Sequence, residues 1–169
     1  MKLKLLILLF TLSVLLAACG DQSTNYESPV TFYYIQNELE FGTESGVIIA
    51  TTRESKGHTD DYDYLITQYL NGPTSYDCIS PFPAGTTLEE LHWDSNRVQV
   101  VLSPQITTLN GVDLMVACAC LTRTVSEMTG INTIQIRSSS GLLNGESLLT
   151  LTPDSFNYWD QATSSDSLN

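Results

Sequence analysis

Cysteine and histidine are the side chains of this sequence best suited to metal binding or nucleophilic chemistry. The cysteines are Cys19, Cys78, Cys118 and Cys120, and the histidines are His58 and His92. Cys118 and Cys120 are two positions apart in a predicted helix and point about 200° apart, so they neither bond to each other nor share an ion. Neither histidine has the spacing to these cysteines that a zinc site needs. We therefore expect no metal and no cofactor.

Cys78 follows the first predicted helix and could reach Cys120 or Cys118 if the two helices lie side by side. A disulfide from Cys78 suits an exported chain, because oxidising compartments favour such bonds. Alternatively, Cys118 falls among apolar residues, where a free thiol packs as a small apolar side chain. The sequence leaves both arrangements open.

Two further groups invite a catalytic interpretation. His92 and Asp94 could belong to a Ser-His-Asp triad, but both lie at the end of one predicted strand, and the chain has no Gly-x-Ser-x-Gly motif. The run Ser138-Ser139-Ser140-Gly141 lacks the Gly-x-x-x-x-Gly-Lys pattern of a phosphate-binding loop. We expect no enzymatic activity and no small-molecule substrate.

The N-terminus has the features of an export signal. Lys2 and Lys4 precede an apolar run, residues 5–16, that is short for a membrane span. The next residues, Leu16-Ala17-Ala18-Cys19, resemble the lipobox of bacterial lipoproteins, in which a peptidase cuts before the cysteine and a lipid is attached to its thiol. This resemblance predicts a signal peptide over residues 1–18, a lipidated Cys19, and a flexible polar tether over 19–29.

The chain is strongly acidic, with a formal net charge of −12 over 169 residues. Loss of residues 1–18 would remove two lysines and no acidic residue. Such a surface repels nucleic acid and anionic lipid headgroups, so attachment to a membrane would come from the acyl chains. We expect no nucleic-acid partner.

Apolar and turn-forming residues define the elements of the first half. β-Branched and aromatic residues predict strands over 30–35 and 46–55. Apolar residues at helical spacing predict a helix between Thr59 or Asp60, as its cap, and the stop signal Gly72-Pro73.

The second half repeats this order. A hairpin is predicted over 88–103, and a helix over 110–129 capped by Asn110 and closed by Gly130. Its predicted buried stripe comprises Leu114, Cys118, Leu121, Val125 and Met128. A strand over 131–138 precedes a hairpin over 142–151 with an Asn-Gly turn. The order β-β-α-β-β-α-β-β predicts a single α+β domain, with two helices on one face of a mainly antiparallel sheet.

Four short motifs in the central part of the chain resemble the GerMN domain, a sporulation and spore-germination module of envelope lipoproteins. They are YLNGP at 69–73, PAGTTL at 83–88, VVLS at 100–103 and LTRTV at 121–125. The resemblance covers roughly residues 30–152. One departure is Val101, which stands where the third motif usually has an acidic residue.

The resemblance implies an assembly module without catalytic chemistry, because GerMN domains resemble the ring-building modules of secretion machines. The motif residues would then be determinants of the fold. They are Gly72, Pro73, Pro83, Gly85, Thr86, Leu88, Leu102 and Ser103.

Together these features predict a GerMN-like domain over 30–157 and a polar tail over 158–169, on the outer face of the cell membrane. The expected function is a lipid-anchored interaction module that binds envelope proteins, self-associates, or both, in sporulation or germination. Exposed tyrosine or tryptophan side chains at one sheet edge would suit that role. The alternatives are a small ligand-binding lipoprotein, which requires a pocket with convergent polar groups, and an envelope hydrolase, which requires a cleft with a perturbed carboxylate or histidine.

Overall fold

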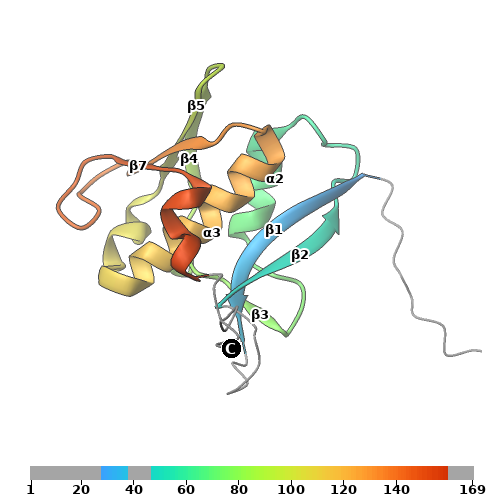
Figure 1. Ribbon diagram of the computed structural model, residues 1–169, viewed down its shortest axis with the longest axis horizontal. Helices are drawn as coiled ribbons and strands as arrows, with labels where there is room; N and C mark the ends of the chain where they lie inside the picture. Colours follow the sequence, from blue (N-terminus) through green and yellow to red (C-terminus); the bar gives the residue numbers. More distant parts are fainter. Residues whose placement is uncertain (1–27, 38–46, 160–169) are drawn as a thin grey trace, which may run out of the picture.

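The computed structural model describes residues 28–37 and 47–159, which form two β-sheets and two α-helices (Figure 1). The first sheet contains β1 (Pro29–Gln36), β2 (Ile48–Glu54) and β3 (Cys78–Ile79). The second contains β4 (Leu88–Trp93), β5 (Arg97–Leu102), β6 (Thr133–Ser138) and β7 (Leu149–Leu151). The helices are α2 (Tyr62–Leu70) and α3 (Gly111–Thr129), with short 3₁₀ helices η1 (Pro104–Thr108) and η2 (Pro153–Trp159).

The signal peptide, Cys19 and most of the predicted tether lie outside the described residues, as do residues 160–169 of the predicted tail. No helix in the described part of the chain is both long and apolar enough to cross a membrane.

The α+β class and the mainly antiparallel pairing are confirmed, and the strands lie in two sheets instead of the expected one. The strand orders are β2-β1-β3 and β4-β5-β6-β7. The one parallel pair among the described strands, β5 and β6, is joined by α3. A crossover helix is the usual connection between parallel neighbours. The ribbons of α2 and α3 lie between the two sheets (Figure 1).

Helix α3 occupies the centre of the molecule, in contact with β1 of the first sheet and β6 of the second. Every residue from Val116 to Thr122 is buried. The predicted stripe is therefore only part of the buried surface, and Met128, at its end, is only half-buried. A helix that is apolar on all sides is a core helix, and the small side chains of Ala117 and Ala119 leave room for both sheets.

The helix ends agree with the predicted stop signals and with the predicted cap position of α3, but not with the predicted cap of α2. Asp61, not Thr59 or Asp60, caps α2, and its Oδ1 accepts a hydrogen bond from the Tyr64 amide at 3.1 Å. Asn110 occupies the cap position of α3 without a side-chain capping bond, whereas Gly130 ends that helix with a φ of 71°.

The Asn144-Gly145 turn forms as predicted, but the predicted hairpin does not. Both residues have positive φ, and Leu143 and Glu146 exchange backbone hydrogen bonds of 2.8 and 3.0 Å, as in a type I′ turn. The pairing stops there, because β7 pairs instead with β6. In that register Leu149 and Leu151 are opposite Ile136 and Ile134, which are both buried.

Candidate functional site

The His92 and Asp94 side chains serve different local structures. His92 Nε2 lies 3.2 Å from Glu90 Oε2 on the same strand. Asp94 Oδ1 accepts hydrogen bonds from the Asn96 and Arg97 amides at 2.8 and 3.1 Å and so closes the β4–β5 turn. The bond from the Asn96 amide is the main cause that lowers the pKa of Asp94. His92 is therefore a strand residue, and Asp94 is a turn residue.

The serine run closes on itself. Ser138 Oγ donates to the Ser140 carbonyl oxygen at 2.5 Å and accepts from the Ser140 amide at 3.3 Å. Within the described ranges, no group of three or more His, Cys, Asp or Glu side chains could hold a metal ion.

Cys78, Cys118 and Cys120 are all free thiols, so the structure contains no disulfide from Cys78 to either cysteine of α3. Cys78 is fixed in β3 opposite Gln36, at the end of the first sheet. Cys118 and Cys120 lie within the central helix, where burial raises the pKa of each thiol to about 12. Both are core side chains with little thiolate at neutral pH.

The first motif, YLNGP, is tied to β2 by an arginine. Gly72 has a φ of 93°, a conformation that favours glycine. Arg53 Nη2 donates to the Gly72 carbonyl oxygen at 2.6 Å and to the Tyr34 hydroxyl at 3.1 Å. These bonds fix the turn from Gly72 into Pro73 against the first sheet.

The second and third motifs are bonded to each other. The amide and the hydroxyl of Thr86 both donate to the Pro83 carbonyl oxygen, at 3.1 and 2.8 Å, and Gly85 between them has a φ of 81°. This is the geometry of a type II turn. Ser103, buried at the end of β5, accepts from the Thr87 amide through Oγ at 2.9 Å and donates its own amide to the Thr87 carbonyl oxygen at 2.9 Å.

Leu88 and Leu102 are direct partners at the start of the β4–β5 pairing, and Leu102 is completely buried.

The fourth motif supplies a bond between helix and strand. Thr124 Oγ1 of α3 accepts from the Tyr33 amide of β1 at 3.0 Å. The Tyr69 hydroxyl of α2 donates to the Tyr33 carbonyl oxygen at 2.9 Å. The short β3 pairs only with Ile35 and Gln36 of β1, so Thr124 reaches the Tyr33 amide next to it. Tyr33 is therefore hydrogen-bonded to both helices.

An aromatic cluster fills the space between α2 and the first sheet. The Tyr69 ring lies 5.0 Å from the Tyr34 ring and 5.7 Å from those of Phe32 and Phe82. The Arg53 guanidinium lies over the Phe32 and Tyr34 rings at 5.2 and 5.6 Å. Sequence reasoning missed Arg53. Arg53 lies on the same face of the sheet as Phe32 and Tyr34, because it pairs with Val30 of β1. This position becomes evident only once the register of the strands is known.

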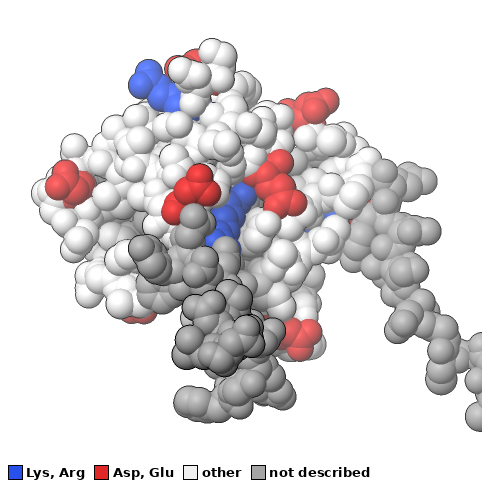
Figure 2. Space-filling view, viewed as in Figure 1, with Lys and Arg blue, Asp and Glu red and all other residues white. Residues whose placement is uncertain are grey.

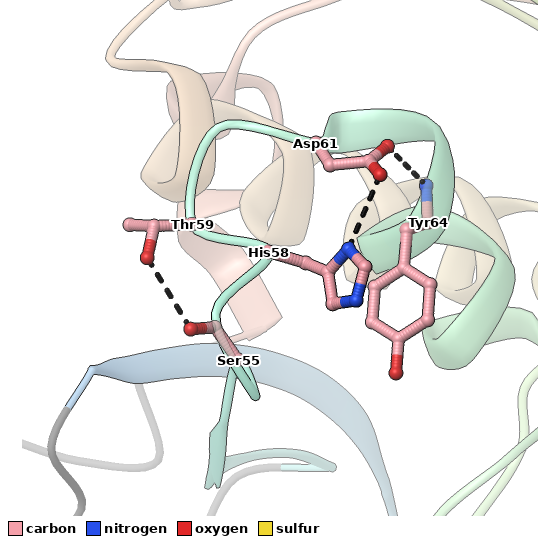
Figure 3. A network of polar contacts seen from close by, with 5 residues as sticks. All are labelled: Ser55, His58, Thr59, Asp61 and Tyr64. Atoms are coloured by element: carbon pink, nitrogen blue, oxygen red, sulfur yellow. Dashed lines mark hydrogen bonds and ion pairs between the residues drawn. The ribbon is translucent and has the colours of Figure 1, made fainter.

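A second cluster lies where the chain passes from β2 to α2. His58 stacks on Tyr64 with 3.8 Å between ring centroids, and His58 Nδ1 lies 3.3 Å from Asp61 Oδ2 (Figure 3). In the same turn the Ser55 and Thr59 hydroxyls are 3.3 Å apart. Backbone capping by Asp61 explains the position of the carboxylate.

The outer face of the second sheet is polar. His92, Gln99, Gln135 and Thr150 are consecutive partners in one row across the four strands. In the neighbouring row, Glu90 and Arg137 lie on either side of the buried Val101 and are joined by a 3.1 Å ion pair.

The aromatic side chains of Tyr76 and Trp93 are strongly exposed, at 94% and 53%. They do not share one sheet edge. Tyr76 precedes β3 of the first sheet, whereas Trp93 ends β4, an edge strand of the second sheet. The β4–β5 hairpin that carries Trp93 projects from the body of the molecule (Figure 1). Acidic side chains are dispersed over the face shown in Figure 2, which has fewer basic ones.

Comparison with solved structures finds the same fold in a sporulation protein. The tandem GerMN domains of GerM from Bacillus subtilis match with a TM-score of 0.55 and 16% identity, over 80% of this chain and 49% of that chain. The first GerMN domain alone matches with a TM-score of 0.50 and 15% identity, over 75% and 98% of the two chains. This chain thus spans about half the length of the tandem-domain structure, and at these identities the likeness shows the fold alone.

No curated protein sequence matches the chain. A family model does, however, match residues 31–141, from β1 to the loop after β6. It describes a family of sporulation and spore germination and covers more than half of the chain. The chain therefore belongs to the Germane family.

Proposed function

We propose that this protein is a lipid-anchored, non-catalytic component of the bacterial envelope, whose Germane domain binds another protein during sporulation or germination. The family supports the biological setting. The lipobox-like residues that end at Cys19 support the anchor. The observation that carries the interaction role is the exposed Trp93 on the projecting β4–β5 hairpin.

The hairpin presents Trp93 in a fixed position. The Tyr62 ring of α2 packs edge-on against the Trp93 ring, with centroids 5.8 Å apart and planes at 82°. The hydrogen bonds to Asp94 close the adjacent turn. A large aromatic side chain that is half exposed yet already ordered loses little entropy on binding, and tryptophan is enriched among residues that dominate binding energy.

The strand that carries Trp93 is open at one edge. Among the described strands, β4 has a neighbour, β5, on one side only. Its base is protected by a bulge between Leu88 and Glu90 and by the charge of Glu89, which are devices that discourage unwanted strand pairing. The open edge available to a partner is therefore the distal part, from Leu91 to Trp93.

Site-directed photo-cross-linking in cells tests this role. A photoreactive amino acid in place of Trp93 should give a defined cross-linked protein. The same amino acid in place of Tyr76, which is more exposed but lies at the other sheet, is the matched control. Equal cross-linking from both positions, or none from position 93, would contradict the hairpin as the interface.

A further inference from the structure

We infer that the cleft between β2 and α2 is a binding site for a small anion, a carboxylate or phosphate attached to a flat apolar group. This cleft, which we call the Arg53 cleft, has a volume of about 310 Å³. Its lining includes Phe32, Arg53, Lys56, Tyr64, Gln68 and Thr74. The volume lies at the lower end of the range for small-molecule sites, so the ligand must be small.

Arg53 is held in place with most of its donors unused. Its Nη2 makes the bonds to the Gly72 carbonyl oxygen and the Tyr34 hydroxyl. Its Nε and Nη1, which carry three of the five guanidinium N–H groups, have no hydrogen-bond partner among the described residues. A planar guanidinium that is already ordered, with donors left over, is suited to bind a carboxylate or phosphate through two hydrogen bonds.

Tyr34 links Arg53 to the end of α2. The Tyr34 hydroxyl donates to the Tyr69 carbonyl oxygen at 3.0 Å, which leaves its oxygen free to accept from Arg53. Burial raises the pKa of Tyr34 to about 12, so this arrangement persists at neutral pH.

The Arg53 cleft carries two basic side chains whose charge is not neutralised by an ion pair within the described residues. Among the basic residues of the described segments, Arg97 and Arg137 form ion pairs of 3.3 and 3.1 Å with acidic side chains. Arg53 and Lys56 form no ion pair within 4.0 Å there, and both line the cleft. One acidic residue, Glu54, also lines it and is exposed. In a chain with a net charge of −12, two uncommitted cations beside one carboxylate make a local site for an anion.

Aromatic rings supply the apolar part of the site. Phe32 is buried beneath the Arg53 guanidinium, and Tyr64 forms part of the α2 side of the cleft. Stacking with His58 holds the Tyr64 ring, as Figure 3 shows. The Gln68 amide and the Thr74 hydroxyl add polar groups at the α2 side. This combination favours an anion on a flat body over inorganic phosphate alone.

This inference goes beyond the proposed function, because the Arg53 cleft lies at the first sheet and the β4–β5 hairpin belongs to the second. Either site can be active without the other. Failure of photo-cross-linking at position 93 would leave the cleft untouched, and failure of anion binding would leave the hairpin untouched.

Ligand-observed ¹⁹F NMR with the full chain in detergent micelles tests the inference. The probes are 4-fluorobenzoate, 4-fluorophenyl phosphate and, as the neutral match, 4-fluorobenzyl alcohol. We expect one or both anions to bind at least about tenfold more tightly than the alcohol, since hydrogen bonds to a charged group are the stronger kind. Binding should be measured at constant chloride. Inorganic phosphate, added as a competitor, should displace the aromatic anions only weakly, because it should bind more weakly than they do.

Three variants locate the binding. Arg53→Gln should abolish anion binding. Lys56→Asn should weaken it by roughly threefold to tenfold, because it removes one charge at an exposed position. Asparagine tolerates the φ of 53° at this position, so this variant keeps the test valid if Arg53→Gln does not fold. Arg97→Gln, which makes the same change in net charge at the other sheet, should leave anion binding unchanged.

The inference is overturned if the alcohol binds as tightly as the anions, or if none binds up to about 10 mM, which is weaker than any affinity expected of a specific site. Equal weakening by Lys56→Asn and Arg97→Gln would also overturn it, because that result would reflect only the net charge of the chain.

Discussion

At the scale of single residues, Arg53 and Gly72 show how a sequence motif depends on a residue outside it. The hydrogen bond from Arg53 to the Gly72 carbonyl oxygen joins the end of α2 to β2. The positive φ of Gly72 was predictable, because a glycine before proline after a helical pattern is a typical stop signal. The partner of its carbonyl was not, because hydrophobic spacing does not indicate which distant donor reaches a given backbone oxygen.

The backbone at Gly72 provides the first prediction. Gly72→Val should lower the free energy of unfolding by about 1–2 kcal/mol, because a β-branched residue is strained at a φ of 93°. Space is not the limit, since an added Cβ would have Ser80 Cβ as its nearest neighbour, at 3.9 Å. Gly72→Asn is the matched control and should lose less. Denaturant melts of the two variants measure the difference, and equal losses would refute the conformational explanation.

Cys19, which lies outside the described residues, provides a second prediction from the sequence. Cys19→Ala should abolish metabolic labelling of the protein by fatty acid, because the thiol is the expected site of attachment. A Cys78→Ala variant, altered at a buried cysteine of the domain, should still be labelled. Persistent labelling of Cys19→Ala would place the lipid elsewhere.

At the scale of elements, α3 departs furthest from its sequence pattern. Apolar spacing predicted one buried stripe, yet the helix is buried on all sides from Val116 to Thr122. The pattern was misleading because alanine, cysteine and threonine suit a crowded interior and a helix surface alike. Only the presence of two sheets, not one, explains why these small residues are buried.

Two threonines of α3 form a matched pair for the third prediction. Thr124 Oγ1 accepts from the Tyr33 amide, whereas Thr122 Oγ1 is the buried side-chain oxygen in the described residues that has no partner. Thr124→Val should therefore cost about 1–3 kcal/mol of stability, because it leaves a backbone donor unpaired. Thr122→Val should be neutral or stabilising. Thermal or denaturant unfolding checks the sign of each change, and a larger loss for Thr122→Val would contradict this assignment.

The strands show where local sequence is insufficient. The hairpin over β4 and β5 was predicted because alternating residues flank a short polar turn. Cys78-Ile79 lies in a stretch rich in proline and serine, between the first predicted helix and the hairpin, where no strand was predicted, but it pairs with β1 as β3. β7 joins β6 although the Asn144-Gly145 turn favours a local hairpin. Both departures are pairings between segments distant in sequence, which turn chemistry does not encode.

At the scale of the whole molecule, buried tyrosine and cysteine side chains link stability to alkaline pH. Burial raises the pKa of Tyr34 from 10.0 to about 12 and those of Cys118 and Cys120 from 9.0 to about 12. The folded state therefore retains protons that the unfolded state releases. This contribution is fully present below pH about 9 and is lost as the pH rises towards about 12.

The fourth prediction follows from this sign. The denaturant midpoint should be insensitive to these groups between about pH 7 and 8.5 and should fall steadily between about pH 9 and 12. Urea denaturation at several pH values measures this midpoint. A midpoint that is constant to pH 11 would mean that the buried hydroxyl and thiols ionise freely in the folded protein.

In the whole molecule, we expect the anchored domain to bind a protein partner through its β4–β5 hairpin. Confinement to a surface raises the effective concentration of a weak binding module, so the interaction should depend on both the anchor and the hairpin. The acidic composition argued against nucleic acid and anionic lipid headgroups as partners. Only the three-dimensional arrangement distinguishes Trp93 from the more exposed Tyr76.

Recovery of the partner after general chemical cross-linking of intact cells, which leaves position 93 free for substitution, tests this claim most directly. At equal protein abundance, Trp93→Ala should reduce recovery by about tenfold or more, which corresponds to a loss of roughly 1.4 kcal/mol or more. Cys19→Ala should reduce it as well, whereas Tyr76→Ala should leave it unchanged. Undiminished recovery with Trp93→Ala, or loss only with Tyr76→Ala, would contradict the account.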